Sequence, residues 1–182
     1  MKLASETVIR EAADLLQTKF QVQCERQKLF PWLKFEGKPI TPAIYFGPPV
    51  NCFFAFDSAD HFNAARLETL DRYPADVPLG FDFQLYRELC RRNPAAIDGR
   101  MRRQANQDSV LDLLPPKRQM NPTLRLAEAE MRDRISGPLT ASKLRGVIGD
   151  LLEDRVGFHA GTTFLQLLEH PSGKPSQFPL AG

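Results

Sequence analysis

The stretch from residue 50 to residue 70, VNCFFAFDSADHFNAARLETL, constrains the fold of this chain more than any other. Its first seven residues are apolar, aromatic or small, and no charge occurs before Asp57, which is typical of a strand covered on both faces. Asp57 and Ser58 carry short polar side chains that can accept hydrogen bonds from the free amides at a helix start. Helical spacing of apolar residues follows from Ala59. The stretch therefore predicts a strand, a turn and a helix at the centre of a core.

The length and composition predict an ordinary globular protein. A chain of 182 residues suits one domain, with or without a small appended part, and 42% apolar with 25% charged residues argues against general disorder. The net charge of +2 is too small to indicate nucleic acid or membrane by itself. The N-terminal residues lack the apolar core of a signal peptide, and no apolar run is long enough to span a membrane. We therefore expect a cytoplasmic protein.

The remaining pattern predicts an α+β fold. Apolar spacing indicates further helices at residues 5–24, 58–73, 81–93, 122–135 and 140–157. Two short aromatic strands are expected at 32–35 and 43–46, on either side of a turn at Glu36-Gly37-Lys38. Glu128/Arg132 and Glu130/Arg134 have the i,i+4 spacing of surface ion pairs. Residues 94–114 stay undecided, and residues 158–168 fit either a strand or a short helix.

We thus expect a small, aromatic-rich, mostly antiparallel sheet packed by helices, with a helical C-terminal part. An α+β core domain would cover residues 1–114. The proline-containing segment 115–122 is the predicted linker, and residues 123–170 would form a helical C-terminal part packed on the core. Residues 171–182 are expected to form a loosely ordered tail.

The order of strand, Asp-Ser turn and helix resembles the second half of an RNA-recognition motif. The resemblance covers about twenty residues and implies that Phe53, Phe54 and Phe56 stack on bases. The motif's leading basic residue and glycine are replaced here by Asn51-Cys52. The other interpretation, which we favour, places the three phenylalanines in the core because phenylalanine is usually buried.

A cysteine-dependent enzyme would use Cys52 as nucleophile with His159 or His61 as its base. Cys52 lies inside the predicted strand rather than at a helix start, so a buried, reduced thiol is the favoured interpretation, as it is for Cys24 and Cys90. His61 reads most simply as a surface residue. The histidines and cysteines lack the spacing of a metal site, and nucleotide-binding motifs are absent, so no cofactor or metal is expected.

Residues 87–118 carry eight basic side chains against four acidic ones, which is the main charge asymmetry of the sequence. Such a segment suits contacts with phosphates or with an acidic protein surface. We predict a non-catalytic binding protein that acts as an adaptor, inhibitor or regulator of a partner, which we expect to be another protein. Its surfaces would be this segment and the prolyl-aromatic segment 30–49, with nucleic-acid binding as the alternative. The predicted binding residues are Arg91, Arg92, Arg100, Arg102, Arg103, Lys117 and Arg118.

Overall fold

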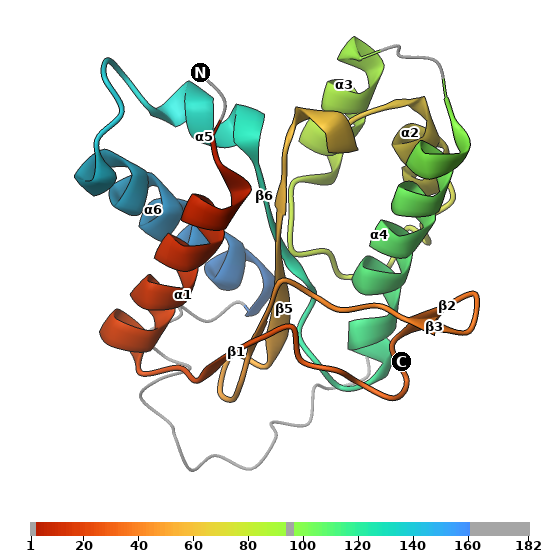
Figure 1. Cartoon of the computed structure of the whole chain (residues 1–182), viewed down its shortest axis with the longest axis horizontal. Helices are drawn as coiled ribbons and strands as arrows, with labels where there is room; N and C mark the ends of the chain where they lie inside the picture. The colour runs from red at the N-terminus through yellow and green to blue at the C-terminus, as the bar shows by residue number, and fades with distance from the viewer. Residues whose placement is uncertain (1–2, 94–96, 161–182) are drawn as a thin grey trace.

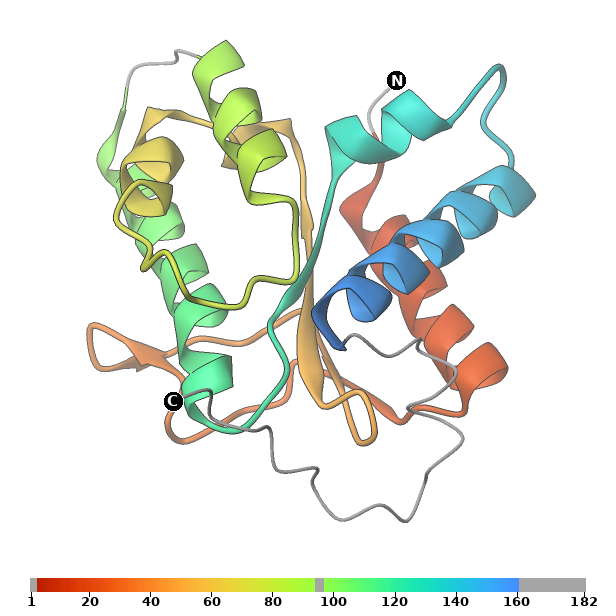
Figure 2. The same cartoon turned by 180° about the vertical axis from the view of Figure 1, so that it is seen from behind.

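The computed structural model of the chain describes residues 3–93 and 97–160. A four-stranded sheet separates two groups of helices, with α1, α5 and α6 on one side and α2, α3 and α4 on the other (Figure 1, Figure 2). The described elements are α1 (Ser5–Phe20), β1 (Cys24–Arg26), β2 (Lys34–Phe35), β3 (Lys38–Pro39), β4 (Ile44–Phe46), β5 (Cys52–Asp57), the 3-10 helix η1 (Ala59–His61), α2 (Ala64–Leu70), α3 (Phe83–Arg92), α4 (Gly99–Lys117), β6 (Leu124–Ala127), α5 (Glu128–Arg134) and α6 (Ala141–Ala160).

The strand order in the sheet is β1-β4-β5-β6. β4 runs antiparallel to both β1 and β5, whereas β5 and β6 are parallel, with Phe54 opposite Leu124. This arrangement confirms the predicted α+β class with a mostly antiparallel sheet. Of the described helices, none is long and apolar enough to cross a membrane.

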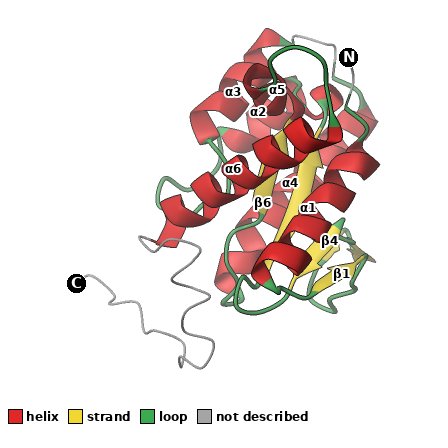
Figure 3. Ribbon diagram, turned by 90° about the vertical axis from the view of Figure 1, so that its left-hand side faces the viewer, coloured by secondary structure: helices red, strands yellow, loops and turns green. Residues whose placement is uncertain are grey.

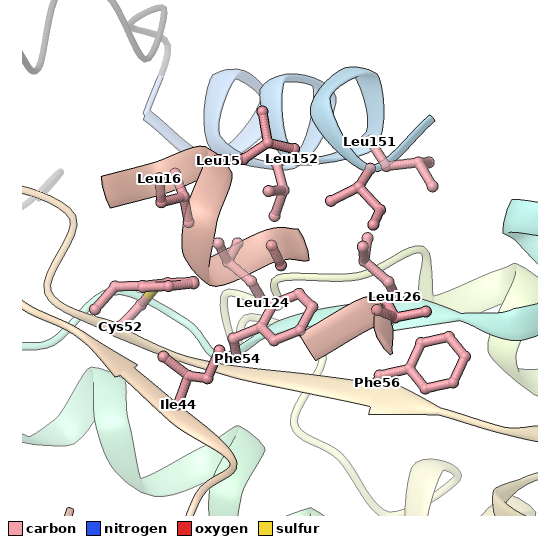
Figure 4. Close-up of a cluster of buried hydrophobic side chains, with 14 of the residues drawn as sticks. Leu15, Leu16, Ile44, Cys52, Phe54, Phe56, Leu124, Leu126, Leu151 and Leu152 are labelled. Atoms are coloured by element: carbon pink, nitrogen blue, oxygen red, sulfur yellow. The ribbon is translucent and has the colours of Figure 1, made fainter. Parts of the chain in front are cut away.

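The predicted strand at the centre of the core is confirmed. Phe54 and Phe56 of β5 face α1 and α6, where they pack with leucines of β6 and both helices (Figure 4). Phe53 belongs to the aromatic cluster on the opposite face of the sheet. The three rings are 0–7% exposed, so the stacking on bases that the RNA-recognition resemblance implies is wrong. Burial on both faces explains why this strand has no alternation of polar and apolar residues.

The helix expected over residues 122–135 is wrong in its first half, because Leu124–Ala127 form strand β6. All four residues are buried. Figure 3 shows the strand between the helical layers. The helical half is α5, where Glu128 and Arg132 form the predicted i,i+4 pair at 2.6 Å, although Glu128 is buried and not on the surface as expected. The predicted Glu130/Arg134 pair does not form, because these two residues reach across to α6 instead.

Two other predicted helices have different bounds. The helix expected over 58–73 begins only at Ala64, and its N-cap is Asn63, whose side chain accepts a hydrogen bond from the Arg66 amide at 3.0 Å. The chain between β5 and α2 forms η1. The N-terminal helix ends at Phe20, because the next residue has a left-handed backbone (φ 53°) and β1 follows. By contrast, α3 and α6 occupy the predicted stretches, and α6 continues beyond residue 157 to Ala160.

The remaining expectations concern the hairpin and the undecided segment. Lys34–Phe35 pair with Lys38–Pro39 rather than with β4, through a turn whose Glu36 and Gly37 have positive φ angles. Residues 99–117 form α4, which extends through Pro115 and into the segment predicted to be a linker. The expectations for the tail and for most of 158–168 lie outside the described residues.

Gly80 marks a close crossing between the loop that joins α2 to α3 and the start of β6 (Figure 2). It forms a parallel bridge with Leu124, and a Cβ atom placed there would lie 2.2 Å from the Thr123 carbonyl oxygen. Only glycine fits this approach of two backbones. The crossing holds the loop against the strand that carries the buried arginine described next.

Candidate functional sites

A buried arginine on β6 organises the most polar part of the interior. Arg125 is fully buried and its guanidinium donates to three carboxylates. Its Nε lies 2.6 Å from Asp112 Oδ1, its Nη1 2.8 Å from Asp57 Oδ1 and its Nη2 3.2 Å from Asp108 Oδ1. Asp57 ends β5, whereas Asp108 and Asp112 lie one turn apart on α4 and therefore share a helix face. The cluster thus joins the sheet to α4.

Three further side chains donate hydrogen bonds to Asp112 or Asp57. Arg66 of α2 donates to Asp112 Oδ2 at 2.7 Å, and the Tyr73 hydroxyl donates to the same oxygen at 2.7 Å. The Tyr86 hydroxyl donates to Asp57 Oδ2 at 2.9 Å. Buried charges are tolerated only when they are paired and hydrogen-bonded in this way.

The charges shift the pKa values of the carboxyl groups. Burial raises the pKa of Asp57 and of Asp108, but the positive groups of Arg125, His61 and Arg66 together outweigh this effect and lower both pKa values. The three aspartates and two arginines leave one negative charge uncompensated. A single positive charge beside the carboxylates therefore neutralises the cluster.

His61 of η1 stands at that position. Its Nδ1 atom lies 3.0 Å from Asp57 Oδ1 and 3.6 Å from Asp108 Oδ2. Burial by itself would lower the pKa of His61, but close polar contact with Asp108 and Asp57 raises it to about 10. In the absence of another cation, a proton on the imidazole balances the cluster at neutral pH.

A cavity of about 200 Å³ adjoins the cluster. Asp57, His61, Asp108 and Arg125 contribute to its wall, and Gln104 adds an amide that lies 3.3 Å from Asp108 Oδ1. This volume accommodates several water molecules or a small ligand. The arrangement therefore brings ionisable groups, a ring nitrogen and open space together at the end of a strand.

Comparison with protein-family models, curated proteins and solved structures finds no match for this chain. Its function is therefore inferred from the described side chains alone.

The predicted binding residues fall into two groups. All seven are exposed. The five arginines from Arg91 to Arg103 flank the start of α4, whereas Lys117 and Arg118 lie at its end, roughly 26 Å away at 1.5 Å per residue. Several arginines of the first group contact acidic side chains, as Arg102 does with Glu68 at 3.4 Å. The first group is therefore partly neutralised.

The second group meets the prolyl-aromatic segment. The Arg118 guanidinium lies 5.7 Å from the centre of the Trp32 ring, which in turn lies 5.3 Å from the centre of the Phe30 ring. Lys28 Nζ lies 5.4 Å from the Phe30 ring centre, and Leu29 is 66% exposed. We call these five residues the basic–aromatic face. It joins the C-terminal end of the basic segment to the prolyl-aromatic segment, which the sequence predicts as separate surfaces.

Cys52 is buried in β5 and 1% exposed, and burial raises the pKa of its thiol. His61, one proposed base, instead contacts the aspartates, and the side chain of the other, His159, lies outside the described part of the chain. These features oppose formation of a reactive thiolate.

We therefore predict that native Cys52 reacts with iodoacetamide on the order of 100-fold more slowly than in the urea-unfolded chain, because the thiolate is scarce and inaccessible. Mass spectrometry of the labelled peptide measures the rate. Half-buried Cys24 provides an internal comparison and should react faster than Cys52. Labelling of Cys52 at the unfolded rate would restore the cysteine-enzyme hypothesis.

The buried cluster was missed by sequence reasoning. The sequence pattern predicts a helix start at Asp57, and it places His61 at the surface or as a base for Cys52. The available signals were an arginine inside the apolar run LRLA and two aspartates four residues apart on an otherwise amphipathic segment. Charges at such positions indicate a buried partner, but they do not identify it.

Proposed function

We propose that this protein binds another protein through the basic–aromatic face and acts as its adaptor, inhibitor or regulator. The contact of Arg118 with Trp32 is the observation that carries the proposal, because it joins the end of the basic segment to the aromatic segment. Arginine and tryptophan are the residues most enriched among those that dominate binding energy at protein interfaces.

The composition of the face indicates the chemistry of the partner. Arg118 and Lys28 place positive charges beside the Trp32 and Phe30 rings, Lys28 is also paired with Glu25 at 2.6 Å, and Leu29 adds a side chain that is 66% exposed. A complementary surface has acidic side chains around an apolar centre. Charge then contributes to orientation and association rate, while the apolar centre contributes most of the affinity.

The test is the charge reversal Arg118→Glu, combined in a second variant with Leu29→Glu. A partner captured from a nuclease-treated lysate of the source organism is purified, and its affinity is measured by calorimetry. We expect Arg118→Glu to weaken binding at least about tenfold, because truncating an interface residue that dominates the binding energy costs more than about 1–2 kcal/mol. The double variant should weaken binding further.

The matched control Arg72→Glu alters an exposed arginine outside the face and should bind like the wild type. Equal effects of Arg118→Glu and Arg72→Glu would contradict the proposal.

Nucleic-acid binding is the second candidate, because aromatic rings with adjacent cations also suit single strands. It requires an affinity for oligonucleotides that falls linearly with the logarithm of the salt concentration. A protein interface with an apolar centre is less sensitive to salt. The charge reversals Arg102→Glu and Arg103→Glu test the other basic group: unchanged retention on DNA or RNA removes that group from this candidate.

A further inference from the structure

We infer that Asp57, His61 and Asp108 form a binding site for one divalent transition-metal ion, such as Mn²⁺. One ligand atom from each side chain lies within 4.8 Å of the others. The imidazole Nδ1 lies 3.0 Å and 3.6 Å from the two carboxylate oxygens. Bonds from metal to nitrogen or oxygen of about 2.0–2.2 Å place two ligands on one ion no more than about 4.4 Å apart. Both measured separations meet this condition.

The orientation of His61 is a separate observation that supports the site. Its Nδ1 atom is completely buried, yet it has no hydrogen-bond partner of acceptable geometry. The N–H bond or lone pair of Nδ1 is therefore not directed at the nearby oxygen of Asp57 or of Asp108. Because one oxygen of each aspartate lies within 3.6 Å of this nitrogen, a metal ion bound to Nδ1 would have both carboxylates within reach. Metal binding would thus satisfy a buried polar atom that the described protein groups leave unsatisfied.

The two carboxylates retain the capacity to bind a cation. Asp57 Oδ1 accepts from Arg125 and has a second lone pair available. Arg125 and Gln104 contact Oδ1 of Asp108, whereas Oδ2 of Asp108 faces His61. The arginine therefore orients the carboxylates from behind, as outer-shell partners do in metal sites.

The donor set and the charge select the class of ion. Two carboxylates with one imidazole suit Mn²⁺, Fe²⁺ or Zn²⁺ better than Ca²⁺, because a nitrogen ligand favours transition metals. The cluster has one uncompensated negative charge when His61 is neutral, so a divalent ion leaves one positive charge. An anionic ligand on the cavity side, such as hydroxide or the carboxylate or phosphate of a small molecule, would balance it.

The adjoining cavity provides room for such a ligand. Three protein ligands leave at least one coordination position of the ion vacant. The cavity is bordered by the three proposed ligands and by Gln104. The site therefore has the composition of an open metal centre rather than of a closed structural one.

The experiment titrates the chelator-treated full chain with MnCl₂ and follows the free Mn²⁺ signal by electron paramagnetic resonance. We expect one tight site in the wild type, with a nitrogen coupling in the pulsed spectrum. His61→Ala should abolish the coupling and weaken binding about 100-fold or more, because loss of an outer-shell partner alone already costs 10–100-fold. Asp108→Asn, which keeps the shape of the side chain, should also weaken binding. Circular dichroism establishes that both variants are folded.

The matched control is the double variant His159→Ala/His170→Ala, which removes the other two histidines of the chain. It should retain the site and the nitrogen coupling. Equal Mn²⁺ affinity of wild type and His61→Ala, loss of binding in the double variant, or no binding by the wild type would each overturn the inference. If His61→Ala does not fold, Asp108→Asn with the nitrogen coupling as readout decides the question.

Discussion

Replacing Arg125 by methionine is expected to destabilise the protein by about 3–5 kcal/mol, the range measured when one partner of a buried ion pair is removed. The substitution leaves Asp57, Asp108 and Asp112 in the interior without the guanidinium that bridges them. Arg66 still pairs with Asp112, but among the described residues Asp57 and Asp108 then keep only His61 as an ion-pair partner, beside the neutral donors Tyr86 and Gln104. The free energy of unfolding from urea titration measures the loss.

Two variants make this prediction specific. Arg134→Met removes an arginine that is 41% exposed and pairs with an exposed aspartate at 3.0 Å, and it should cost less than about 1 kcal/mol. Adding Asp57→Asn to Arg125→Met should recover part of the loss, because fewer unpaired carboxylates remain. A cost below about 1 kcal/mol for Arg125→Met would show that the cluster contributes little to stability.

Replacing Phe54 by alanine should cost about 3–5 kcal/mol, as other phenylalanine truncations in cores do. Phe54 is fully buried at the centre of β5, and its ring centre lies 5.9 Å from that of Phe46. The strand is paired on both sides and covered by helices on both faces, so its surroundings have little freedom to close the resulting cavity.

The same change at a partly exposed phenylalanine is the control. Phe83 begins α3 and stacks on Tyr73 with 6.3 Å between ring centres. Its truncation removes less buried surface and should therefore cost clearly less. Urea titrations of both variants provide the comparison. Similar losses at the two positions would mean that the centre of β5 packs less tightly than the structure indicates.

The sequence predicts those elements whose signal is local. β5 was found from a continuous apolar run, and α6 from leucines and isoleucine spaced along one face. β6 was missed because the four residues LRLA fit a helix as well as a strand, and the arginine reads as a polar position. Its conformation depends on parallel pairing with β5, which lies about 70 residues earlier in the chain. Pairing over that distance has no local sequence pattern.

The candidate sites divide in the same way. Exposure of the basic residues follows from their charge, and it was predicted. The meeting of Arg118 with Trp32 depends on how the β2–β3 hairpin packs against α4, and spacing in the sequence does not reveal it. Asp57 and Asp108 come together only because β6 places Arg125 between their elements. Long-range packing, rather than spacing, therefore creates both sites.

The late position of β6 in the chain has a consequence for biosynthesis. One edge of β5 has no partner until Leu124–Ala127 have left the ribosome. At about 5–20 residues per second, the nascent chain spends roughly 3–14 s in that state. During this interval an apolar strand presents open backbone groups to its surroundings, which is the condition that favours pairing with other chains. Rapid translation of the segment between β5 and β6, or a chaperone that covers β5 during this interval, should therefore raise the yield of native protein.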